Sequence, residues 1–74
     1  MESLTREQIE ELAVLYDAFA HALDPFDPAR DAAEAQFMEK LTRHHAAIAP
    51  RTGFPDFRRE AVRVCKLFLR RNQP

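Results

Sequence analysis

The sequence predicts an all-α fold, a small antiparallel three-helix bundle, and two observations lead to it. Apolar residues recur every three or four positions in three successive segments, which is the spacing of helices packed along one side. Prolines and the single glycine fall between these segments, where helices end. Short connections favour neighbouring helices that run antiparallel. The 74 residues contain no repeat and no linker, so a single domain over residues 1–74 is expected.

The first helix is expected near residues 5–23. Thr5 and Gln8 have the spacing of a capping box, in which each side chain bonds the other residue's backbone N–H. The expected end lies before Pro25, because proline disfavours the α conformation in the residue that precedes it. The apolar stripe of this helix comprises Ile9, Leu12, Tyr16, Phe19 and Leu23.

The second and third helices are expected near residues 28–48 and 55–71. Asp27 is a good N-cap and Pro28 suits the first helical position, where its missing N–H costs nothing. Gly53 lies in the turn that separates the two helices. The second stripe comprises Ala33, Phe37, Leu41, His44 and Ile48. The third stripe comprises Phe57, Ala61, Val64 and Phe68.

The charges are divided unevenly along the chain, although the net charge is −1. Residues 1–39 carry ten acids and two bases, which gives −8. Residues 40–74 carry nine bases and two acids, which gives +7. Such a division indicates a charged partner. It also has a local explanation, because acids at helix starts and bases at helix ends interact favourably with the helix dipole.

A cytoplasmic location is expected from three features. Cys65 is the only cysteine, so the chain forms no internal disulfide, which fits a reducing compartment. No apolar run approaches the ~18–20 residues of a membrane helix, so no membrane partner is expected. Residues 1–3 lack the basic and apolar regions with which a signal peptide begins.

Residues that could carry chemistry do not converge, so neither an enzyme nor a metal or other cofactor is expected. His21 lies on the polar face of the first helix, and His44 and His45 diverge by about 100° on the second. Cys65 has no histidine at its level and is expected to act as a small apolar core residue. His44, within a core stripe, needs a hydrogen-bond partner in the core or in another chain.

Four bases on the third helix form the most specific pattern in the sequence. They recur at positions i, i+4, i+7 and i+11, within about 60° of one another and opposite the core stripe. Three interpretations stay open: a solvated face, a contact for an acidic protein surface, or a contact for nucleic-acid phosphates. The four residues are Arg59, Arg63, Lys66 and Arg70.

Apolar residues beside these bases widen the apolar arc of the third helix. Val62 and Leu69 extend it beyond what two neighbouring helices easily cover, and Val14 and Phe26 also lack an expected place in the core.

We therefore expect a non-enzymatic interaction module, a small adaptor, regulatory or inhibitory protein. Its third helix would bind another protein, with an acidic surface as one candidate, or a second copy as a homodimer. The alternative is a nucleic-acid-binding bundle, which the near-zero net charge disfavours.

Overall fold

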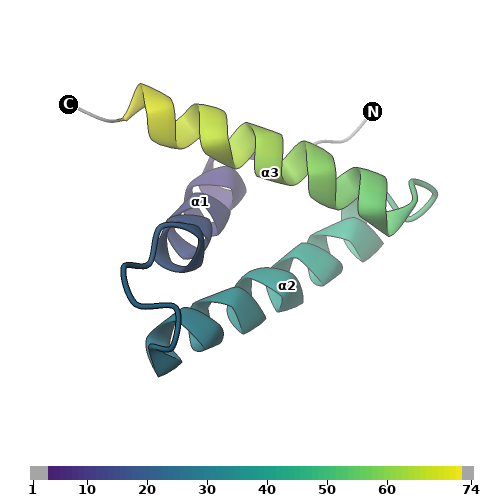
Figure 1. The fold of residues 1–74 in the computed structure, drawn as a ribbon. Coiled ribbons are helices and arrows are strands. Elements are labelled where there is room, and N and C mark those ends of the chain that lie inside the picture. The colour runs from purple at the N-terminus through teal and green to yellow at the C-terminus, as the bar shows by residue number, and fades with distance from the viewer. Residues whose placement is uncertain (1–3, 73–74) are drawn as a thin grey trace.

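The computed structural model describes residues 4–72, and three helices make up its fold (Figure 1). They are α1 (Arg6–Ala20), α2 (Pro28–Ile48) and α3 (Phe54–Arg71). Helix α1 packs against both other helices, whereas α2 and α3 contact each other least. In Figure 1, α2 and α3 run in opposite directions and open away from the loop that joins them. The predicted all-α three-helix bundle is confirmed.

The helix starts are fixed by the predicted local signals. Thr5 Oγ1 accepts a hydrogen bond from the Gln8 N–H, and the Gln8 side chain accepts one from the Thr5 N–H. Asp27 Oδ1 accepts the Ala29 N–H at 2.9 Å, with Pro28 at the first position of α2. These bonds satisfy N–H groups that have no partner inside the helix.

The end of α1 differs from the expectation. The helix ends at Ala20, with His21 as its C-cap, so the stripe expected to reach Leu23 ends at Phe19. Leu23 is fully exposed. The residues before Pro25 belong instead to a turn, in which the Asp27 N–H donates to the Asp24 carbonyl.

The core lies where α1 faces both other helices. Phe37 of α2 is 1% exposed, and its ring lies 6.0 Å from Tyr16 and 5.3 Å from Phe19 between ring centroids. Cys65 is fully buried and lies closer to the centre of the core than Val64, which the sequence had favoured. The buried cluster comprises Leu12, Ala13, Phe37, Leu41, Phe57, Ala61 and Cys65.

A histidine fixes the loop between α2 and α3. The His45 Nε2–H donates to the Thr52 carbonyl at 2.5 Å. The same ring packs against Phe54 and Phe57, with centroid separations of 5.4 and 5.3 Å. His45 therefore holds the end of α2 against the beginning of α3.

An ion pair joins α1 to α2. Lys40 Nζ contacts Glu11 Oε1, and both side chains are partly exposed. The hydrogen bond from Lys40, with the attraction of its charge, lowers the pKa of the Glu11 carboxyl. Because the folded-state pKa is depressed, this contribution to stability is present above the unfolded pKa and is lost as the pH falls through the folded value.

We expect Glu11→Gln to remove a small, acid-sensitive part of the stability. Urea unfolding of the wild type and the variant should differ at neutral pH, and the difference should shrink below about pH 4.3, the ordinary glutamate pKa. In a Lys40→Gln background the same substitution should have no such effect. A difference that persists at low pH would show that the pair does not cause it.

Candidate interaction surface

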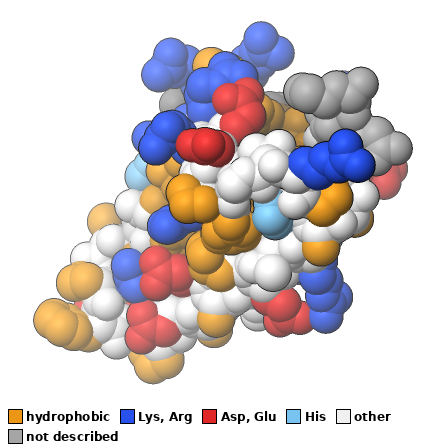
Figure 2. All heavy atoms as spheres, turned by 90° about the vertical axis from the view of Figure 1, so that its right-hand side faces the viewer, with side chains coloured by type: hydrophobic (Ala, Val, Ile, Leu, Met, Phe, Trp, Pro, Cys, Tyr) orange, Lys and Arg blue, Asp and Glu red, His pale blue; other side chains and the backbone are white. Residues whose placement is uncertain are grey.

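The four predicted bases of α3 lie together on its exposed side. Arg59, Arg63, Lys66 and Arg70, here called the basic stripe, are all exposed to solvent. In Figure 2, lysine and arginine side chains gather at the top of the molecule, where α3 lies. The structure therefore brings these predicted site residues onto one surface.

The ion pairs of the basic stripe stay within α3. Arg59 Nη1 lies 3.6 Å from Asp56 Oδ1, and Arg63 contacts Glu60 one turn before it. The second pair lowers the pKa of the Glu60 carboxyl and raises that of the Arg63 guanidinium. Within residues 4–72, Lys66 and Arg70 have no ion-pair partner. No base of the stripe is therefore tied to α1 or α2 in the part of the chain described.

The apolar residues beside the stripe divide into two kinds. Val62 and Leu69, both predicted to contact a partner, are partly buried and pack against the core cluster. Leu67 was not singled out from the sequence, but it is 37% exposed. It follows Arg63 by four residues and precedes Arg70 by three, which places it on the edge of the stripe. That spacing is the signal that could have identified it.

An apolar hollow of about 590 Å³ opens at the end of the molecule where α2 joins α3. Figure 2 shows the face that includes this loop, with apolar side chains gathered near its centre and charged ones around them. Arg51, Asp56 and Glu60 supply charged groups to its lining. Its main apolar lining comprises Leu4, Ile9, Ile48, Phe57, Ala61 and Val64.

The histidines and the cysteine have separate surroundings. His21 Nδ1 lies 2.7 Å from Asp17 Oδ1 on the exposed side of α1, whereas His45 belongs to the loop contact. The Nε2 atom of His44 is buried and has no hydrogen-bond partner within residues 4–72. Among those residues, no three histidine, cysteine or acidic side chains are grouped closely enough to hold a metal ion.

Cys65 is chemically shielded by its burial. Burial raises the pKa of its thiol to about 11 from an ordinary value of 9.0. Each pKa unit changes the thiolate population tenfold, so the folded protein has about 100-fold less thiolate. Because the thiolate is the reactive form, Cys65 behaves as an apolar core residue.

Alkylation should accordingly distinguish folded from unfolded protein. With iodoacetamide at pH 8, we expect Cys65 to react at least about 100-fold more slowly in the native state than in urea. Mass spectrometry over a time course measures both rates. Equal rates would place the thiol at the surface and contradict its position in the core.

Comparison of the chain with protein-family models, with curated proteins and with solved structures finds no match. None of the three helices, over the residues described, is both long and apolar enough to cross a membrane.

Proposed function

We propose that the protein is a small, non-enzymatic interaction module that binds an acidic surface of another protein through the exposed side of α3. The observation that supports this is the basic stripe, four aligned bases without an ion pair to either neighbouring helix among residues 4–72. The lone buried cysteine fits a reducing compartment, and the proposal places the module in the cytoplasm.

The bases of the molecule differ in whether their ion pairs join two helices or stay within one helix. Lys40 joins two helices through Glu11, so its charge contributes to tertiary structure. Arg59 and Arg63 pair only along their own helix, and exposed pairs of this kind contribute little to stability. A partner's carboxylates can replace Asp56 and Glu60 at little energetic cost to the fold.

Leu67 gives the surface an apolar contact beside its charges. Buried apolar residues usually carry most of the energy of a protein interface, while charges at the rim steer the approach and set specificity. Leu67 is exposed next to Arg63, whereas Val62 and Leu69 already use part of their surface against the core. The proposed interface therefore centres on Leu67 and the stripe, with Val62 and Leu69 at its edge.

Capture of the partner tests this proposal. Immobilised wild type should retain a protein from the source cell that an Arg63→Glu/Lys66→Glu variant does not retain. Nuclease treatment should leave that capture unchanged, and the complex should re-form from purified components. The control is Arg43→Glu, which reverses an exposed base of α2 away from the stripe and should leave the capture unchanged.

Capture that disappears with nuclease would instead favour the nucleic-acid interpretation. The purified protein would then bind DNA or RNA with a log affinity that falls with log salt by about 0.7–0.9 per phosphate contacted. Equal retention by the wild type and the stripe variant would contradict both functions.

A further inference from the structure

The three helices differ in charge, although the charges nearly cancel over the whole chain. With histidine counted as neutral, α1 carries four acids and one base, which gives −3. Helix α2 carries three acids and three bases, which gives zero, and α3 carries two acids and six bases, which gives +4. The one base of α1 is Arg6, its first residue. Helices α1 and α3 therefore have strong charges of opposite sign.

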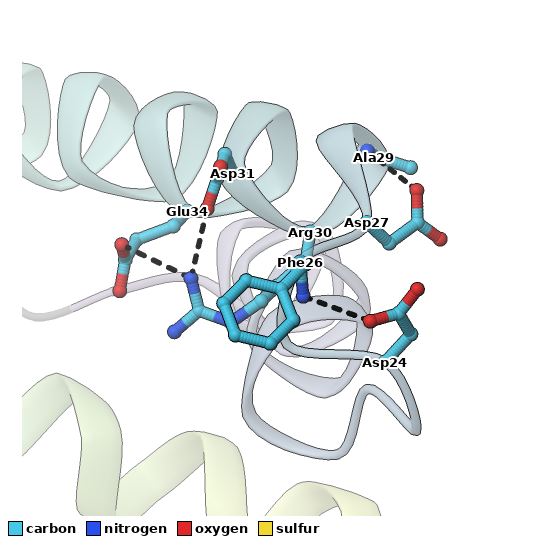
Figure 3. A network of polar contacts seen from close by, with 7 residues as sticks. All are labelled: Asp24, Phe26, Asp27, Ala29, Arg30, Asp31 and Glu34. Carbon is cyan, nitrogen blue, oxygen red and sulfur yellow. Dashed lines mark hydrogen bonds and ion pairs between the residues drawn. The ribbon is translucent and has the colours of Figure 1, made fainter.

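The charges of α2 pair mainly with one another. Arg30 Nη1 lies 3.0 Å from Asp31 Oδ1 and 3.7 Å from Glu34 Oε1 (Figure 3). Farther along the helix, Arg43 Nη2 lies 2.7 Å from Glu39 Oε1. Because these charges are balanced locally, α2 offers a partner little net charge to recognise.

The charged sides of α1 and α3 do not meet within one chain. The two helices pack against each other through buried apolar residues. Within residues 4–72, no ion pair joins α1 to α3, and only Glu11 links α1 to another helix, through Lys40 of α2. The other acids of α1 and the bases of α3 are therefore exposed to solvent without meeting each other.

The exposed sides of these two helices share one pattern with opposite charges. On each helix, an exposed apolar residue follows one charged residue by four positions and precedes another by three. Such spacing places the members of each set on one side of the helix. The set on α1, here called the acidic face, comprises Glu10, Val14 and Asp17. The set on α3 comprises Arg63 and Arg70 of the basic stripe, with Leu67 between them.

We propose that the acidic face of α1 in one copy binds the basic stripe of α3 in a second copy. The second copy is the partner because it carries the complementary charges at the same spacing. With the two helices parallel, Glu10 lies against Arg63 of the other copy, and Asp17 lies against Arg70. Seven residues, or about 10.5 Å of helix, separate the charges on both sides. Opposite charges favour this pairing, and like charges disfavour α1 against α1 or α3 against α3.

The apolar residues meet at the centre of this arrangement. Val14 and Leu67 are both exposed in the single chain, and each lies between the two charges of its set. Contact between them removes apolar surface from water, which favours association. An interface made of one helix side from each copy is small and belongs with weak, transient complexes. We therefore expect self-association only at high protein concentration.

This self-association goes beyond the proposed function, although both use the basic stripe. It assigns an interaction surface to α1 and needs no other protein, and it competes with a partner for α3. Glu10→Lys/Asp17→Lys separates the two proposals, because that variant should lose self-association and still capture the partner. If capture fails while the wild type self-associates, only the proposed function is wrong.

Sedimentation equilibrium over a range up to several hundred micromolar tests the pairing. At about 10 mM salt, where the Debye length is about 30 Å, the wild-type average mass should rise above the monomer value of 8.6 kDa as concentration increases. At about 1 M salt, where that length is about 3 Å, the rise should disappear.

Charge reversal shows which side chains pair. Glu10→Lys/Asp17→Lys should remain monomeric at low salt, once circular dichroism shows that it is folded. Arg63→Glu/Arg70→Glu should also remain monomeric, under the same condition. An equimolar mixture of the two should associate, because the basic stripe of the first protein can bind the acidic face of the second. A single chain with all four substitutions should self-associate like the wild type, since both members of each pair are exchanged.

The control reverses two exposed acids of α2, in Asp31→Lys/Glu39→Lys. It changes the net charge as much as Glu10→Lys/Asp17→Lys does, and it should associate like the wild type. A wild type that stays monomeric at low salt would overturn the proposal, and so would a mixture or a four-substitution chain that stays monomeric. Loss of association in the control would also contradict it, because association would then depend on net charge alone.

Discussion

Replacing Phe37 with alanine should largely unfold the domain. The side chain is 1% exposed and forms the α2 side of an aromatic cluster with Tyr16 and Phe19. Deleting a buried phenylalanine costs about 3–5 kcal/mol, because transfer energy is lost and a cavity remains. A single core in a chain this short rarely supplies more than ~3–5 kcal/mol in total. Circular dichroism and urea unfolding measure the loss.

Phe68→Ala is the matched comparison for Phe37→Ala. Both remove a phenylalanine ring predicted to lie in a core stripe, but Phe68 is only partly buried near the end of α3. Its removal should therefore cost distinctly less, and the variant should keep a cooperative unfolding transition. A Phe37→Ala protein as stable as Phe68→Ala would mean that the aromatic cluster is not the centre of the core.

Leu12→Ala should cause the second large loss of stability. Leu12 is fully buried between helices, and truncation of such a leucine costs about 2–5 kcal/mol. Val14, only two residues later on α1, is 63% exposed. Val14→Ala should therefore change stability by no more than about 0.5 kcal/mol.

Thermal unfolding of these two variants tests the rotation of α1 about its axis. A large destabilisation by Val14→Ala together with a tolerated Leu12→Ala would require α1 to bury a different face. That result would also remove the pairing of Glu11 with Lys40, since it depends on the same rotation.

Helix starts were predictable because their causes are local. Thr5 with Gln8, and Asp27 with Pro28, specify where α1 and α2 begin through bonds that span only two or three residues. The predicted range 28–48 for the second helix matches α2 at both ends. Such capping interactions depend little on the rest of the fold.

Features that depend on packing were less predictable. Leu23 continues the helical spacing of α1, yet the turn before Pro25 ends the helix three residues earlier. Cys65 was expected to be a small apolar core residue outside the main stripe of the third helix, and it is fully buried, whereas Val64 of that stripe is only partly buried. Periodicity gives the apolar side of a helix, but the neighbouring helix decides which residue lies deepest.

The same distinction applies to the candidate sites. The basic stripe lies on one helix, so spacing alone predicted that its four side chains share a face. The apolar hollow draws Ile9 from α1, Ile48 from α2 and Val64 from α3, and no pattern along the chain indicates that they meet. Leu67 was not predicted, because only the structure shows that it is exposed beside the stripe.

One paired measurement tests directly whether the bases of α3 serve binding and not folding. For Lys66→Glu and Lys40→Ala, the affinity for the captured partner and the free energy of unfolding are measured on the same protein samples. We expect Lys66→Glu to weaken binding about tenfold or more, equivalent to about 1.4 kcal/mol, and to leave stability unchanged. Lys40→Ala should lower stability, because it removes the ion pair between α1 and α2, and should leave binding unchanged. The claim is contradicted if Lys66→Glu binds normally, or if it destabilises the fold as much as Lys40→Ala does.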